Sequence, residues 1–208
     1  MGYRIIVAGI GPGNPKYVLP AAAEAIQNAR VLVGGSRALA DFAHEGQTTM
    51  PIRGDIPAVM DFIRKNLETS DVVAMVSGDP GYYSLLDALR REFPEDVIMV
   101  IPGISSVQYA FAKLALPWHD ALLLSFHGRV PDDAALKYEK GKLLGLLTDA
   151  KYSSKTIPDV LMKHGWPADA RLSVCSRLSY EDEEIVRTTL GKAADEKEQT
   201  HCILVVEG

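Results

Sequence analysis

The chain of 208 residues is long enough to bury a substantial core, in one large domain or two small ones. Its 47% hydrophobic and 24% charged residues are typical of a soluble protein, and a net charge of −5 disfavours a broad electrostatic grip on nucleic acid. No stretch approaches the roughly 20 apolar residues of a membrane span, and the first residues lead into an apolar run instead of a signal peptide, so we expect a cytoplasmic protein.

Apolar runs and amphipathic segments alternate through the first half of the chain. Runs rich in β-branched residues lead into three loops dense in glycine and proline, at residues 9–13, 77–81 and 102–106. Such runs predict buried parallel strands. Helices are predicted from Pro20, after Asp55, and over residues 82–89 and 107–114, where apolar residues recur at helical spacing. The first half is therefore predicted to be a parallel sheet covered by helices, an α/β domain.

A break at Pro117 predicts a boundary between an N-terminal α/β domain, residues 1–116, and a C-terminal α/β domain, residues 117–208. Residues from about 130 to 165 look helical with polar loops, whereas 171–175, 185–190 and 202–206 look like strands. Strands this close together predict a mixed or partly antiparallel sheet. The acidic runs 182–184 and 195–198 are predicted to be solvated turns. Cys175 and Cys202 are predicted to be reduced core residues, and no zinc site is indicated.

The three loops are expected on one sheet edge, around one cleft, because ligands of open α/β sheets bind beyond the carboxyl ends of the strands. In the first loop Gly9 and Gly11 suit a dinucleotide site, but Asn14 stands where a third glycine is needed. Pro12 also removes a backbone N–H from the turn that would hold a pyrophosphate. A nicotinamide or flavin site is therefore disfavoured, which leaves either a tight turn or a close approach by an uncharged part of a ligand.

The other two loops carry polar side chains that have both a local and a functional interpretation. Asp79 either bonds its own backbone in an Asp-Pro-Gly turn or faces a ligand donor. Ser105 and Gln108 form a capping box, and the N–H donors of the same helix start are also available to a ligand. His127, which follows an apolar run, is the one histidine that we single out as a functional candidate.

These motifs together resemble the tetrapyrrole (corrin/porphyrin) methylases over nearly the whole chain. The resemblance rests on residues 9–13, 77–84, 102–108, 116–120, 124–129 and 177–180, followed by Glu183 and Glu184. The first three motifs identify the family. The last three indicate the subgroup of cobalamin synthesis that methylates C5 of precorrin-7 or cobalt-precorrin-7 to give precorrin-8 or cobalt-precorrin-8. Whether the substrate contains cobalt is left open, because the macrocycle itself would hold the metal.

The resemblance implies two α/β domains with S-adenosylmethionine bound in a folded conformation in the cleft between them, and S-adenosylhomocysteine as product. It also implies a homodimer. Because a fused form of this enzyme carries a second domain and this chain ends directly after an apolar run, we expect a separate C15-methylating, decarboxylating partner. The implied cofactor contacts are Pro12, Asp79, Tyr82, Ser105, Ser106, His127, Val174 and Cys175.

Methyl transfer from a sulfonium needs mainly the positioning of two reactants, so no dedicated nucleophile is expected. His127 or Tyr180 is a candidate for the proton transfer that restores the ring. Three arginines that flank the loops are candidates for binding substrate carboxylates, with solvated surface residues as the alternative: Arg53, Arg129 and Arg177. Alternatives are a methylase of the same fold acting at another ring position, on a protein or on ribosomal RNA, a non-catalytic corrinoid- or nucleotide-binding protein, and a nicotinamide-dependent oxidoreductase.

Overall fold

The strands of this protein form two separate sheets, each with its own helices. The computed structural model describes residues 2–208. By its internal contacts the chain divides into two compact units, of which the first ends at Ser105 and the second runs from Ser106 to Gly208. Each unit is an α/β arrangement, which confirms the predicted fold class.

The first unit is built on a parallel sheet of five strands in the order β3-β2-β4-β1-β5. The strands are β1 (Ile5–Gly9), β2 (Val31–Gly34), β3 (Thr48–Pro51), β4 (Val72–Val76) and β5 (Ile98–Ile101). Strand β4 is buried along its whole length, as expected of an apolar run inside a parallel sheet. Loops that follow β4, β1 and β5 therefore leave the sheet from three neighbouring strands at one edge.

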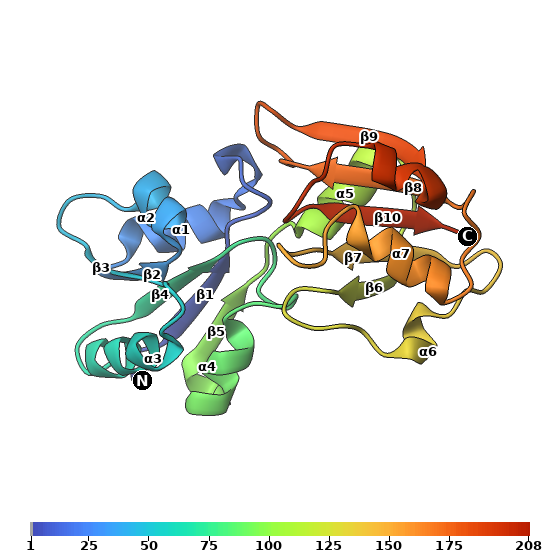
Figure 1. Ribbon diagram of the computed structural model, residues 1–208. Coiled ribbons are helices and arrows are strands. Elements are labelled where there is room, and N and C mark those ends of the chain that lie inside the picture. Colours follow the sequence, from blue (N-terminus) through green and yellow to red (C-terminus); the bar gives the residue numbers. More distant parts are fainter. Residues whose placement is uncertain (1) are drawn as a thin grey trace. The chain divides into compact units, whose positions relative to one another are not determined.

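Helices cover both faces of this sheet (Figure 1). They are α1 (Pro20–Asn28), α2 (Ser36–Phe42), α3 (Ile56–Asn66) and α4 (Leu86–Glu92), with 3₁₀ turns η1 (Pro15–Tyr17) and η2 (Glu95–Val97). Helices α1 and α2 pack on the face that carries Leu32 and Met75, and α3 and α4 pack on the opposite face. The side chain of Asp55 accepts the N–H of Ala58 at 3.0 Å and caps α3, so that helix starts where the sequence predicted.

Helix α4 begins later than the apolar spacing indicated. Tyr82 was predicted to lie inside this helix, but the helix starts at Leu86. Tyr83 has a left-handed backbone with φ of 52°, which a continuous helix does not contain. Tyr82 therefore belongs to the loop after β4.

The second unit begins with a helix and continues with a mixed sheet in the order β6-β7-β10-β8-β9. Strands β6 and β7 are parallel and the remaining pairs are antiparallel, which confirms the predicted mixed sheet. Its elements are α5 (Ser106–Leu114), β6 (Leu122–Ser125), α6 (Asp133–Leu136), β7 (Leu143–Leu147), α7 (Thr156–Lys163), β8 (Arg171–Ser176), β9 (Glu184–Thr189), η3 (Leu190–Asp195) and β10 (Ile203–Glu207).

The prediction that residues 130–165 are helical was wrong for β7. The leucine-rich run of β7 has no period-2 alternation that would indicate a strand. A Cβ atom on Gly145 would lie 3.0 Å from a ring carbon of Phe111 and 2.8 Å from a methyl of Leu123. Glycine at this position lets α5 approach the sheet closely, and the run itself is held as a strand by its pairing with β6 and β10.

Helix α5 packs on β7 and β10 of the second unit. Val107, Ala110 and Phe111 are fully buried on the apolar face of this helix. The compact units therefore divide before α5, at residues 105 and 106, whereas the sequence predicted a boundary at residues 116 and 117. Pro117 follows the end of α5 at Leu114.

Both cysteines are buried and free, as expected of core residues. Burial raises the pKa of Cys175 to about 12 and that of Cys202 to about 11, so neither is a reactive thiolate at neutral pH. Among residues 2–208, no helix has the length and apolar composition needed to cross a bilayer. Within the same residues, no three His, Cys, Asp or Glu side chains gather as a metal site would require.

We predict that the second unit loses stability as pH rises, because of His164. Its Nδ1 lies 2.7 Å from the carbonyl oxygen of Val160 and its Nε2 lies 3.2 Å from Oδ1 of Asp133. Both neighbours are acceptors, so the Val160 carbonyl and then Asp133 raise the pKa of His164 above its usual value. This stabilisation is complete below the unfolded pKa and is lost as pH rises through the folded pKa.

Urea unfolding of the wild type and of His164→Gln, at about pH 5.5 and about pH 8.5, measures this contribution. The wild type should gain more stability than the variant on going to the lower pH. His44, whose ring also faces two carbonyl oxygens, shifts both proteins alike and cancels in the difference. The same pH dependence in both proteins would contradict the assignment.

Candidate functional site

The three glycine- and proline-rich loops of the first unit meet at the carboxyl edge of its sheet. The N–H of Ile10 donates to the carbonyl of Val76 at 2.9 Å. Gly11 and Gly78 exchange two backbone hydrogen bonds, of 3.3 and 2.8 Å, which extend the contact between the loops after β1 and β4. The prediction that these loops share one edge is confirmed for this unit.

Backbone approaches backbone so closely here that only glycine fits. A Cβ atom on Gly103 would lie 2.3 Å from the carbonyl oxygen of Gly78, and one on Gly9 would lie 2.7 Å from the same oxygen. Real Cβ atoms essentially never come so near to another heavy atom. The glycines at 9 and 103 are therefore required by the contact of the three loops, whether or not a ligand binds there.

Asp79 links the second loop to the third. Its Oδ1 accepts the N–H of Gly81 at 2.8 Å, and its Oδ2 accepts the N–H of Gly103 at 3.0 Å. The first bond is the local turn that the sequence suggested as one interpretation. The second bond is tertiary and could not be read from the sequence. An ionised carboxylate has about four acceptor sites, so Asp79 retains capacity for a ligand donor as well.

Tyr82 carries the most informative polar atom of these loops. Its hydroxyl is buried and has no hydrogen-bond partner among residues 2–208. Burial raises the pKa of Tyr82 well above its usual range, so the group is a neutral O–H donor. Its ring packs edge-on against Tyr83, with the ring centroids 4.8 Å apart. A buried hydroxyl without a partner is costly, and a bound ligand is one way to satisfy it.

The remaining candidates of the first unit lie at the same edge. Pro12 is half-buried between Gly11 and Gly13, whose φ values of 74° and 148° are readily adopted only by glycine. Ser105 is buried and stands immediately before α5, in the position of a helix cap. Arg53 is exposed after β3, the strand farthest from β5 in the sheet. Arg53 is therefore not part of the three-loop contact.

In the second unit, His127 follows β6 at the end of that strand. Its side chain is exposed and its ring centroid lies 6.4 Å from that of His201. The backbone around it is held by Ser125, whose hydroxyl accepts the N–H of His127 at 3.2 Å, and by Asp149, which accepts the N–H of Gly128 at 2.9 Å. Ser106 opens α5 and is half-buried, and Arg129 is exposed.

Val174 and Cys175 lie in the middle of β8, which is paired with β9 on one side and β10 on the other. The side chain of Cys175 is fully buried and that of Val174 is 4% exposed. Both are core residues of the second unit in this structure, so their side chains are not presented to solvent.

The turn after β8 holds Arg177 and Tyr180 together. The guanidinium of Arg177 lies 4.5 Å from the centre of the Tyr180 ring, and its Nε donates to Asp182 at 2.9 Å. That partner raises the pKa of Arg177 and lowers the pKa of Asp182. The guanidinium of Arg177 is thus already paired with Asp182 in its own turn in the absence of a substrate carboxylate.

One charged residue in this turn was missed from the sequence. Glu183 was grouped with Asp182 and Glu184 as a solvated turn, yet its side chain is only 15% exposed and pairs with Lys113 of α5 at 2.6 Å. The signal that was available is the period-2 alternation of strands, which places Glu183 on the same side as the half-buried Ile185. The partner on α5 could not be identified from that alternation.

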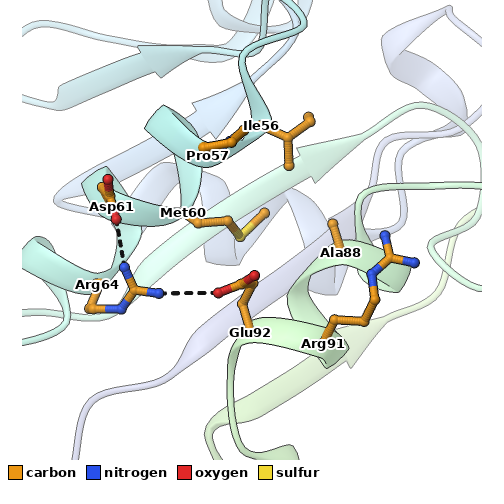
Figure 2. A pocket seen from close by; sticks show the side chains of 8 residues that line it. All are labelled: Ile56, Pro57, Met60, Asp61, Arg64, Ala88, Arg91 and Glu92. Atoms are coloured by element: carbon orange, nitrogen blue, oxygen red, sulfur yellow. Dashed lines mark hydrogen bonds and ion pairs between the residues drawn. The ribbon is translucent and has the colours of Figure 1, made fainter.

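Two pockets of the first unit lie away from these loops. One, of about 210 Å³, lies between α3 and α4 (Figure 2), where Arg64 is bound by Asp61 at 2.6 Å and Glu92 at 3.3 Å. The other, of about 310 Å³, is lined at the amino ends of the strands by residues that include Tyr3, Arg30 and Asp71. Neither contains a predicted site residue.

Comparison with known proteins identifies the family. The family model of the Tetrapyrrole (Corrin/Porphyrin) Methylases matches residues 4–194. The chain belongs to the tetrapyrrole methylases. This tetrapyrrole methylase is 32% identical to the cobalt-precorrin-7 C(5)-methyltransferase of Salmonella typhimurium, over 87% of this chain and 88% of that protein.

Solved structures share the fold of this tetrapyrrole methylase. The methyltransferase CobJ has a TM-score of 0.82 at 22% identity, over 98% of this chain and 93% of that one. The uroporphyrin-III C-methyl transferase from Thermus thermophilus, solved in complex with S-adenyl homocysteine, has a TM-score of 0.74 at 19% identity, over 98% of this chain and 91% of that one. At these identities the likeness establishes the two-unit α/β fold.

We predict that Gly103→Ala lowers the free energy of unfolding by about 1–3 kcal/mol, because the new methyl group would overlap the carbonyl oxygen of Gly78. Urea denaturation followed by circular dichroism measures the change. Gly35→Ala is the matched control, since a Cβ atom there meets nothing within 4 Å, and should change stability by about 0.5 kcal/mol or less. Equal stability of the two variants would contradict the loop packing described above.

Proposed function

We propose that this chain methylates C5 of precorrin-7 or cobalt-precorrin-7, giving precorrin-8 or cobalt-precorrin-8. The observation that carries the proposal is the match to the Salmonella enzyme, which extends over most of both chains and includes both structural units. A tetrapyrrole methylase takes its methyl group from S-adenosylmethionine, and this coarser assignment follows from membership of the family.

The loops of the first unit suit this cofactor. S-adenosylmethionine, when bound, supplies a methyl group on a positively charged sulfur. The buried hydroxyl of Tyr82 offers a hydrogen-bond donor that no residue among 2–208 uses. The carboxylate of Asp79 can accept a further hydrogen bond from an amino or hydroxyl group of the ligand. Pro12 has no backbone N–H, so the first loop lacks one of the donors that would bind a pyrophosphate. We propose Pro12, Asp79, Tyr82 and Ser105 as the cofactor-binding residues of this unit.

The second unit supplies the remaining proposed residues. The proposed cofactor contacts of this unit are Ser106, His127, Val174 and Cys175. Ser106 and His127 are the more accessible pair, because the side chains of Val174 and Cys175 are buried. His127 and Tyr180 are the proposed groups for proton transfer, since methylation of a ring carbon requires a proton to leave if the conjugated ring is to be restored. Arg53 and Arg129 are proposed to bind carboxylates of the substrate, and Arg177 would first have to release Asp182.

The proposal includes two associations, one with a separate protein and one with a second copy of this chain. Methylation at C15 with decarboxylation is assigned to a separate protein, and the chain itself is proposed to form a homodimer. Light scattering on the purified chain, alone and with a candidate C15 methylase, measures both associations.

The proposed reaction is tested by incubating the purified chain with methyl-labelled S-adenosylmethionine and either metal-free or cobalt-containing precorrin-7. We expect the label at C5, located by NMR, with one of the two substrates preferred. Label at another carbon would make the chain a methylase of a different ring position. Cofactor binding without transfer to either substrate would favour a corrinoid-binding protein.

We predict that Tyr82→Phe weakens binding of S-adenosylmethionine about 3- to 10-fold, the value of one hydrogen bond, without destabilising the free protein. The reason is that the hydroxyl is buried and unpartnered before the cofactor binds, so that its removal relieves a desolvation cost. Calorimetry gives the affinity and urea denaturation gives the stability. Tyr83→Phe, on the exposed neighbour, is the control and should leave affinity unchanged. A stability loss in Tyr82→Phe with unaltered affinity would exclude this role.

A further inference from the structure

The turn between β8 and β9, residues 177–183, has a backbone that needs external support. Arg177 and Ser179 both have left-handed φ angles, of 51° and 70°, although neither is glycine. Such conformations cost free energy and persist only where the surroundings impose them. Leu178 and Ser179 are buried at 6% exposure each, so this part of the turn is not free in solvent.

Glu183 provides a support from the end of this turn. Its Oε2 accepts the N–H of Ser179, one of the two strained residues, at 2.8 Å. Its Oε1 lies 2.6 Å from the ammonium of Lys113, and its carboxylate is also hydrogen-bonded by the side chain of Tyr109. Both partners belong to α5, so Glu183 connects the turn to that helix.

The charge on Glu183 is maintained by these donors. Burial would by itself raise the pKa of Glu183, but the bonds from Lys113, the Ser179 N–H and Tyr109 outweigh it and lower the pKa below its usual value. The ammonium of Lys113 also lies 5.9 Å from the centre of the Tyr109 ring. The carboxylate is therefore ionised at neutral pH, and a neutral replacement would remove its ion pair with Lys113.

We propose that Glu183, through its ion pair with Lys113, is a positioning residue that holds the 177–183 turn in the conformation needed for methyl transfer to the tetrapyrrole. The turn carries Tyr180 and Arg177, and Arg177 pairs with Asp182 within it. This inference rests on the proposed function, because it assigns the turn to the acceptor side of that reaction. Glu183 itself touches neither cofactor nor substrate in this assignment.

The test uses Glu183→Gln, Lys113→Met and the double variant, with Glu184→Gln as the matched control. Glu184 is the adjacent carboxylate, exposed and bonded to the side chain of Gln199. Each single variant should lower kcat/KM for the tetrapyrrole about tenfold and leave the Kd of S-adenosylmethionine within about twofold of the wild type. The double variant should be no worse than either single one, since both remove the same ion pair. Glu184→Gln should keep wild-type kinetics.

A second measurement does not depend on turnover. Hydrogen exchange at residues 177–183 should accelerate in Lys113→Met and in a further variant, Glu183→Ala, which removes the acceptor of the Ser179 N–H altogether. Exchange should stay unchanged in Glu184→Gln. Wild-type protein that methylates no tetrapyrrole would contradict the proposed function. With an active wild type, any of four results would overturn the positioning role. Three are kinetic: a kcat/KM within twofold of wild type in both single variants, losses of kcat/KM that multiply in the double variant, or a parallel loss of cofactor affinity. The fourth is unaltered hydrogen exchange in the turn.

Discussion

Close backbone contact among Gly9, Gly78 and Gly103 is the constraint on which the carboxyl edge of the first sheet depends. The strand order places β4, β1 and β5 side by side, and the loops after them can touch only where no side chain intervenes. Asp79 then joins the second loop to the third through the N–H of Gly103. An edge made of backbone leaves few polar side chains to recognise a ligand, and the buried hydroxyl of Tyr82 at this edge has no hydrogen-bond partner among the described residues.

Helix α5 connects that edge to the second sheet. It starts directly after the third loop, and its apolar face packs on β7 and β10, where Gly145 makes room for Phe111. Near its end, Lys113 holds Glu183 and thereby the turn that carries Tyr180. The same helix thus follows the loop proposed to bind the methyl donor and contacts, through Lys113 and Glu183, the turn proposed to act on the acceptor.

Strong local signals were sufficient for much of the fold. The β-branched runs formed parallel strands, which are largely buried in β1 and β4. Strand β5 lies at the edge of the sheet and exposes Met99 and Val100, so the prediction that it is buried was wrong. Asp55 capped α3, and the late strands formed a mixed sheet. Strand β7 was missed because a leucine-rich run suits a helix or a strand equally, and its pairing with β6 and β10 joins segments far apart in the sequence. Tyr82 was misplaced into α4 because apolar spacing does not register the left-handed residue that follows it.

The sequence by itself determined the family, the convergence of the three loops and most of the residue types proposed to bind cofactor, because the spacing of glycine and proline and the apolar runs before them are local properties. Only the tertiary structure decided what such residues contact. Asp79 accepts the N–H of Gly103, Arg177 forms an ion pair with Asp182, and the largely buried Glu183 forms an ion pair with Lys113. These contacts either join residues on different elements or depend on the conformation of the 177–183 turn, which is set by the packing of its buried residues. A pattern of residue types along the chain carries no information about which of several charged partners packing will bring within reach.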